Sequence, residues 1–135
     1  MRLQSTDSGE INFGFNAQLD SSSPWFADCS IQGGQKVATQ AAFGCSIFTY
    51  VNGQYKGEYG TETYAVNYDE WHIAKIELVQ STLEFRFYLD GNLIGQHVPV
   101  DANELNGKVL GFGLGITTDT QIIGYFDDVV VQPAK

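Results

Sequence analysis

The chain has 135 residues, which is enough for one domain with a sizeable core. Hydrophobic residues make up 43% and charged residues 17%, a balance that excludes a disordered chain or a coiled coil. Sixteen acidic residues against seven basic ones give a net charge of −9, which excludes the positive surface that a nucleic-acid backbone needs. No apolar run approaches the ~18 residues of a transmembrane helix, so we expect neither nucleic-acid binding nor membrane insertion.

Clusters of Gly, Asn, Asp and Ser divide the chain into short segments that favour strands. These segments predict strands at 10–18, 25–31, 36–40, 43–51, 54–59, 62–67, 71–80, 82–89, 92–99, 109–117 and 121–132. One helical turn is expected at 101–105, where an Asp stands three residues before a Glu. No repeat or linker interrupts the chain, so we expect residues 1–135 to form a single domain, a module of a larger protein.

A tight hairpin is predicted at Asn52-Gly53, because Asn-Gly favours the type I′ turn that matches the twist of the flanking strands. A two-residue turn places Tyr50 opposite Tyr55, and we expect Phe48 and Tyr59 on the same face. Alternation alone does not say which face of this hairpin is buried.

A second hairpin is predicted around Asp90-Gly91-Asn92. Its first strand alternates apolar and polar residues, as a half-buried antiparallel strand does. The apolar face predicts a core of Leu83, Phe85, Phe87, Leu89, Ala74, Ile76, Leu78, Leu110, Phe112 and Leu114. The strand at 109–117 also has an all-glycine face, which invites close approach by a ligand or a neighbouring chain segment. About eleven antiparallel strands need two packed sheets or a barrel, and we favour the sandwich.

Three segments carry a resemblance to a known superfamily. They are Trp71-His72-Ile73-Ala74-Lys75-Ile76-Glu77-Leu78, then Phe87-Tyr88-Leu89-Asp90-Gly91-Asn92-Leu93-Ile94-Gly95, and the ending Gly124-Tyr125-Phe126-Asp127-Asp128-Val129-Val130-Val131. This pattern resembles the concanavalin A-like lectin/glucanase superfamily, which includes laminin-G-like domains. The resemblance implies an all-β, antiparallel two-sheet jelly-roll β-sandwich with one convex and one concave sheet. It also implies sugar recognition as one common use of this fold.

The same resemblance implies a structural calcium ion. In jelly rolls of this kind, an Asp two residues before a final Val-x-Val often reaches calcium, and here that residue is Asp127. Oxygens near the first strand, from Asp7 to Glu10, would complete such a site, since calcium takes six to eight oxygen ligands. Alternatively, Asp127 and Asp128 only cap the strand.

Aromatic residues are concentrated between positions 48 and 68, interleaved with Asn, Gln and Glu. Carbohydrate binding needs a flat ring for the apolar side of a sugar and polar groups beside it, and tyrosine offers both. The candidate ligand-binding residues are Phe48, Tyr50, Tyr55, Tyr59 and Tyr64, together with Trp25, which follows a Ser-rich loop. The alternative is that these rings belong to the core.

Catalytic motifs are weak in this sequence. Glycosidases need two carboxylates flanking the sugar, and the family's enzymes carry them as Glu-x-Asp-x-Glu, which is absent here. The two cysteines, Cys29 and Cys45, form neither a zinc nor a redox motif. They are either two buried thiols or a bridge between neighbouring strands.

The sequence therefore predicts a non-catalytic module that binds carbohydrate, with a neutral or basic glycan expected to bind better than an acidic one. A protein-interaction or adhesion module of the laminin-G type, with a protein as partner, is the alternative, and a glycoside hydrolase is the third. We expect an extracellular or cell-surface location. The first residues lack the apolar stretch of a signal peptide, so an export signal would lie outside this sequence.

Overall fold

The computed structural model describes residues 1–4, 9–18, 24–34, 40–100, 102–105, 108, 110–117 and 123–132. Within these residues the protein is all-β with antiparallel sheets, as predicted, apart from one helical turn. The elements are β1 (Arg2–Leu3), β2 (Gly9–Gln18), β3 (Pro24–Gly33), β4 (Gln40–Val51), β5 (Gln54–Gly60), β6 (Tyr64–Asn67), β7 (Ala74–Val79), β8 (Glu84–Leu89), β9 (Asn92–His97), α1 (Ala102–Leu105), β10 (Gly111–Thr117) and β11 (Gly124–Tyr125). The described part of the chain contains no helix that is long and apolar enough to cross a membrane.

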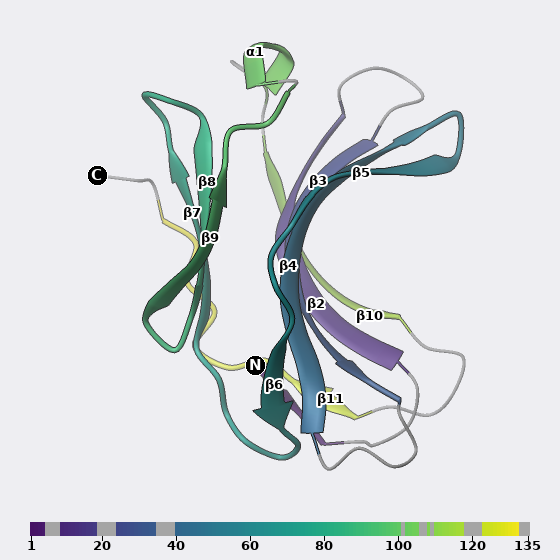
Figure 1. Cartoon of the computed structure of the whole chain (residues 1–135), viewed down its shortest axis with the longest axis vertical. Coiled ribbons are helices and arrows are strands. Elements are labelled where there is room, and N and C mark those ends of the chain that lie inside the picture. Colours follow the sequence, from purple (N-terminus) through teal and green to yellow (C-terminus); the bar gives the residue numbers. More distant parts are fainter. Residues whose placement is uncertain are drawn as a thin grey trace.

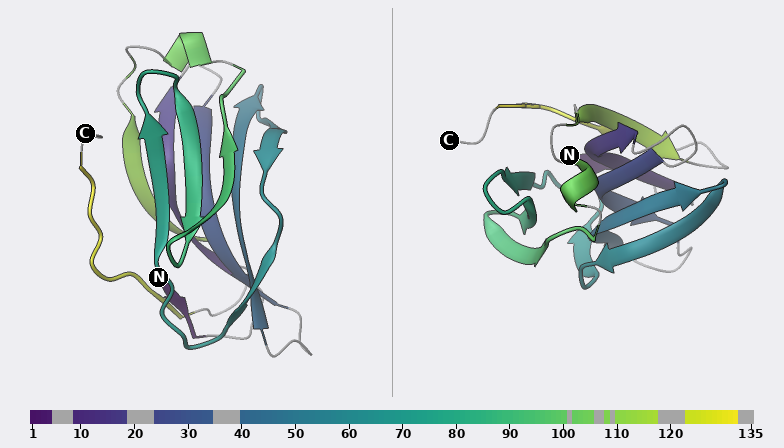
Figure 2. Two further views of the ribbon diagram at one scale, coloured as in Figure 1. Left: turned by 60° about the vertical axis from the view of Figure 1, so that its left-hand side comes forward. Right: turned by 90° about the horizontal axis from the view of Figure 1, so that it is seen from above.

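The strands form two main layers. A six-stranded sheet has the order β10-β2-β3-β4-β5, with β6 also paired to β4, and a three-stranded sheet has the order β7-β8-β9. Figure 1 shows the two sheets facing each other, and Figure 2 shows the same layers from the side and from above. The short strands β1 and β11 pair with each other. The sequence does not predict β1, and of the strand predicted at 36–40 only Gln40 lies within the described residues.

The six-stranded sheet is curved. In Figure 1 its middle bows toward the three-stranded sheet and its ends turn away, so its convex side faces the other layer. The concave side faces away from the other layer, toward solvent. We call this side the concave face.

The predicted hairpin at Asn52-Gly53 is present. Val51 pairs with Gln54, and Tyr50 pairs with Tyr55. Asn52 and Gly53 both have positive φ values, 52° and 76°, as the type I′ turn requires. The turn residues themselves thus specify the register of β4 and β5.

Strands β5 and β6 share one edge of β4. Strand β5 pairs with Ser46–Val51 and β6 pairs with Gln40–Phe43. Between them, Thr61 binds Cys45 twice: its N–H donates to the Cys45 carbonyl at 2.9 Å, and its hydroxyl accepts from the Cys45 N–H at 3.0 Å. These bonds satisfy the backbone of β4 where no strand covers it.

The second hairpin also forms as predicted, and its turn holds the segment before β7. The Asp90 carboxylate accepts a hydrogen bond from the Ile73 N–H at 2.8 Å and lies 2.9 Å from Nδ1 of His72. Trp71 is the first residue of the strand predicted at 71–80, but β7 begins only at Ala74, and Trp71 lies before it and is exposed.

The core lies between the layers. Trp25 and Phe85 pack across the interface with ring centroids 5.2 Å apart, and Phe87 is fully buried. Of the predicted core residues, Phe85, Phe87 and Leu89 are buried, and Ala74, Ile76, Leu78 and Leu110 pack against them. Leu114 contradicts the prediction, since 48% of it is exposed. It lies on β10, which is the edge strand among the described strands of its sheet.

Candidate functional site

The outward-facing side chains of β2, β3, β4, β5 and β10 make up the concave face. They follow from the strand register, because residues paired across neighbouring strands point to the same side. The face carries four aromatic rings, a group of polar side chains and several glycines. These residues are Phe26, Phe48, Tyr50, Tyr55, Glu10, Asn12, Asn16, Asp28, Ser30, Gln32, Ser46, Gly14, Gly44, Gly57, Gly60, Gly111, Gly113 and Gly115.

The four rings form one cluster at the hairpin end of the face. Phe26 and Phe48 are paired residues, and their rings stack with centroids 5.0 Å apart and planes 18° apart. The Tyr50 ring stands edge-on to both phenylalanines, at 6.1 and 5.9 Å. The Tyr55 ring is tilted against Phe48 at 5.3 Å. Contacts of this kind stabilise an aromatic cluster on a sheet surface.

Tyr55 is the most exposed ring of the cluster, with 61% of its surface accessible. A Cβ added at Gly57 would lie 3.0 Å from the Tyr55 hydroxyl oxygen and 3.2 Å from its ring. The ring therefore lies along β5 over the bare backbone of Gly57. This position supports the ring from below and leaves it open to solvent.

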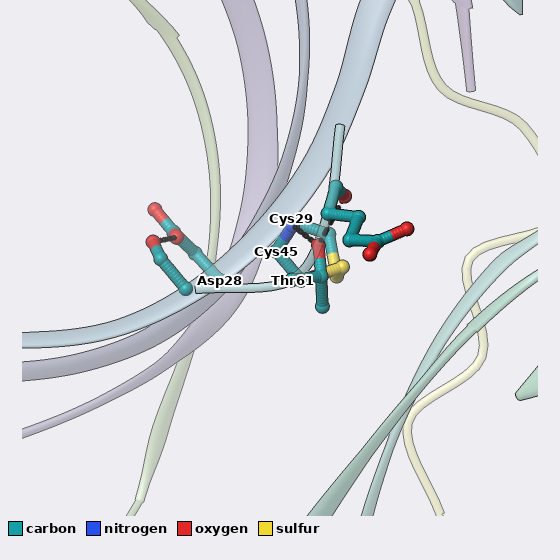
Figure 3. Close-up of a disulfide and its surroundings, with 6 residues drawn as sticks. Asp28, Cys29, Cys45 and Thr61 are labelled. Carbon is teal, nitrogen blue, oxygen red and sulfur yellow. Dashed lines mark hydrogen bonds between the residues drawn. A yellow bond between two sulfur atoms is a disulfide. The ribbon is translucent and has the colours of Figure 1, made fainter. Parts of the chain in front are cut away.

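Asp28 lies next to this cluster, in the middle of β3. Its Oδ1 accepts a hydrogen bond from the hydroxyl of Ser46, the paired residue on β4, at 2.9 Å. On the other side, a Cβ on Gly14 would come within 2.7 Å of the Asp28 Cα, so only glycine fits there. Figure 3 shows Asp28 on one side of the sheet and the Cys29–Cys45 disulfide on the other. The bridge thus joins the two strands directly behind the Asp28–Ser46 pair.

The environment of Asp28 favours its neutral form. Burial is the main cause that raises the pKa of Asp28 from 3.8 to about 6; the Ser46 hydrogen bond opposes this rise, and the negative charge of Glu10 adds to it. Because the folded protein binds this proton more tightly than the unfolded chain does, the contribution of Asp28 to stability becomes more favourable as the pH falls from about 6 toward 4. Above pH 6 the ionised carboxylate destabilises the fold.

Asp28→Asn should therefore stabilise the protein at pH 7.5. We expect a gain of about 1–2 kcal/mol in the free energy of unfolding, since one pKa unit corresponds to ~1.4 kcal/mol and partial exposure reduces the effect. Below pH 4 the gain should disappear. Urea unfolding at both pH values measures it; Glu84→Gln on the other sheet removes a carboxylate that is paired with Arg86, so it should give no such gain. Equal stability of Asp28→Asn and wild type at pH 7.5 would contradict this account.

The other polar side chains of the face bind each other. The two carboxylate oxygens of Glu10 accept hydrogen bonds from the amides of Asn12 at 3.2 Å and Gln32 at 2.7 Å. A Cβ on Gly115 would collide with Asn12, and one on Gly111 would collide with Asn16. The predicted close approach to the glycine face of β10 is thus made by two asparagine side chains of β2.

Tyr59 does not join the aromatic cluster, which corrects the sequence prediction. The register of β4 and β5 shifts between Ile47 and Phe48, so that Phe48 pairs with Gly57 and Ile47 pairs with Tyr59. Glu58 is the extra residue of this β-bulge. After Glu58, each side chain of β5 points to the opposite side of the sheet from the one that regular alternation predicts. Tyr59 therefore lies between the layers, stacked on His97 at 4.8 Å.

Trp25 and Tyr64 are also wrong as members of the site. Trp25 is fully buried, because β3 begins at Pro24 and its alternation turns Trp25 toward the core. Tyr64 pairs with the buried Phe43 and packs against the same core. Both rings therefore pack in the core, which is the alternative that the sequence left open.

Phe26 and Asp28 are the site residues that the sequence analysis misses. Both lie on β3, whose inward residues are the buried Trp25, Ala27 and Cys29. The alternation of this strand was a usable signal, but only the pairing of Phe26 with Phe48 shows that both belong to one surface.

The described residues do not bring the predicted calcium ligands together. Glu10 lies on the concave face, whereas Asp127 lines a cavity with Phe13 and Phe15, on the other side of β2. Asp127 accepts a hydrogen bond from the Asp128 N–H, and Asp7 lies outside the described residues. In the described part of the chain, no three His, Cys, Asp or Glu residues are grouped for a metal ion. Calcium binding stays a prediction without a described ligand set.

Comparisons with protein-family models, curated proteins and solved structures found no match for this chain. The concanavalin A-like resemblance therefore stays a prediction.

Proposed function

We propose that this protein is a non-catalytic, lectin-like module of jelly-roll type that binds carbohydrate on its concave face. The observation that carries the proposal is the exposed Tyr55 ring, held beside Phe48 on the same face as Asp28 and Ser46. The ring offers a flat apolar surface for a sugar, and the oxygens of the Asp28 carboxylate and of the Ser46 hydroxyl, whose own proton is donated to Asp28, accept hydrogen bonds from sugar hydroxyls. Together they supply the two kinds of contact that sugar binding needs.

The charge of this face supports a neutral rather than an acidic glycan. Glu10 and Asp28 point outward here, and no described Lys or Arg does. Lys56 pairs with Thr49, which is buried on the convex side. A carboxylated or sulfated sugar would meet only like charges, and the net charge of −9 adds to the repulsion.

Tyr55→Ala should remove most of the carbohydrate binding and leave the fold intact. An open face leaves much of a sugar in water, so we expect wild-type dissociation constants of ~10⁻⁵–10⁻³ M. An exposed ring contributes little to folding, so the free energy of unfolding should change by less than about 1 kcal/mol. A glycan array, followed by calorimetry on the best neutral ligand, measures the binding, and urea unfolding measures the stability.

Tyr88→Ala is the matched control for this experiment. Tyr88 is a tyrosine of the three-stranded sheet, where Lys75 lies over its ring and its hydroxyl donates to Glu77. Its loss should leave sugar binding unchanged. If Tyr55→Ala binds as tightly as wild type, the sugar site is not on this face. If no neutral glycan binds the wild-type protein, the proposed function is wrong.

A protein-interaction module remains the second candidate function, because one apolar surface lies open. Leu114, Val129, Val130 and Val131 line a cavity of about 130 Å³ beside β7, and all four are exposed. Exposed apolar patches of this kind mark contact sites for other proteins. This function is the one to pursue if the glycan array shows no binding.

An extracellular or cell-surface location belongs to the same proposal. The Cys29–Cys45 disulfide supports it, because disulfides persist in oxidising compartments.

A further inference from the structure

Among the described residues, the carboxylate of Asp28 has no positively charged partner. Its Oδ1 binds Ser46, and no described residue binds its Oδ2. Three elements pack around it on the concave face. Strand β2 contributes Gly14 and the negative Glu10, β4 contributes Gly44 and Ser46, and the outward residues of β10 nearby are glycines.

No group among the described residues compensates a negative charge at this position. A neutral side chain could keep the Ser46 hydrogen bond without the cost of placing an ionised group in a half-buried site. A residue that lowers stability without a compensating partner in the fold is typical of a binding site. What Asp28 lacks is a counter-charge, and a ligand can supply one.

Aromatic rings stand directly beside this uncompensated charge. Phe26 is two residues from Asp28 on the same face of β3, a distance of about 7 Å along the strand. Phe48 holds the equivalent position relative to Ser46 on β4, and Tyr55 packs against it. Phe26 and Phe48 are half-buried and Tyr55 is exposed. A carboxylate next to accessible aromatic rings is the combination that binds an ammonium group, by ion pairing and by cation–π contact.

We propose that the concave face prefers glycans whose sugars carry a protonated amino group, with Asp28 as the residue that determines this specificity. The inference rests on the proposed function. The Tyr55 and Phe48 rings hold the sugar, and the Asp28 carboxylate binds its ammonium group. N-acetylation of the same sugar removes the positive charge and with it the ion pair.

The test compares short glucosamine oligomers with N-acetylglucosamine oligomers of the same length. Calorimetry at physiological ionic strength should show wild type binding the amino form about tenfold more tightly, as a charge-assisted hydrogen bond allows. Asp28→Asn should lose this preference. Glu84→Gln changes the net charge equally but lies on the three-stranded sheet, and should keep the preference.

The pH dependence gives a second measurement on the same proteins. Protonation of Asp28 removes its charge, so the wild-type preference for the amino form should decline as the pH falls below about 6. Asp28→Asn should show no such decline. This profile separates a specific ion pair from a general change in folding.

Three results would overturn the inference. Equal affinity of wild type for both oligomers shows that Asp28 does not bind an ammonium group. The proposed function, carbohydrate binding on the concave face, is not contradicted by this result. An equal loss of preference in Glu84→Gln and Asp28→Asn shows attraction by net charge only. If wild type binds neither oligomer nor any neutral glycan, the proposed function fails together with this inference.

Discussion

Phe87→Ala is expected to lower the free energy of unfolding by about 3–5 kcal/mol, because it removes a large buried ring and leaves a cavity. Phe87 is completely buried on β8, and the Tyr59 ring stacks near it with centroids 6.0 Å apart. The loss affects the contact between the two layers, so it should weaken the whole fold. Urea unfolding followed by tryptophan fluorescence measures it.

Leu93→Ala on the neighbouring strand β9 is the control for Phe87→Ala. About half of Leu93 is exposed, so its truncation should change stability by less than about 0.5 kcal/mol. A loss below about 1 kcal/mol for Phe87→Ala would mean that β8 presents the opposite face to the core.

Replacing Cys29 and Cys45 together by Ala should destabilise the protein by about 3 kcal/mol. The bridge joins residues 16 positions apart, and such a cross-link restricts the unfolded chain. Both side chains are buried, so the bridge also contributes to the core. Urea unfolding of the wild type with and without reductant, compared with the double variant, measures the effect.

Reductant should shift the wild-type unfolding curve toward that of the double variant and leave the double variant unchanged. If reductant has no effect on the wild type, the two residues are the pair of free thiols that the sequence analysis left open.

The turns and strand limits could be predicted because they depend on neighbouring residues. Asn52-Gly53 supplies the positive φ values of its turn, and Asp90-Gly91 does the same for the second hairpin. The alternation of Phe85, Phe87 and Leu89 likewise identified an inner face without reference to any partner strand. The helical turn at 102–105 also follows from local signals.

The aromatic site could be predicted only in part. Phe48, Tyr50 and Tyr55 lie together because the turn between their strands specifies their pairing. Tyr59 lies outside this group because β5 carries one extra residue, Glu58, before it. Such a bulge has no strong sequence signal, yet it reverses every side chain that follows it.

The sequence by itself determined that this protein is all-β, where its hairpins turn and which residues share a strand face, since these properties depend on turn geometry and on a two-residue period. Only the tertiary structure decided which face is buried, because a period of two describes both faces of a strand equally well. The packing of the three-stranded sheet covers Trp25 and leaves Phe26 and Asp28 on the open side. The pairing of distant strands then places Asp28 beside Ser46 and Phe26 beside Phe48, and so creates the candidate site.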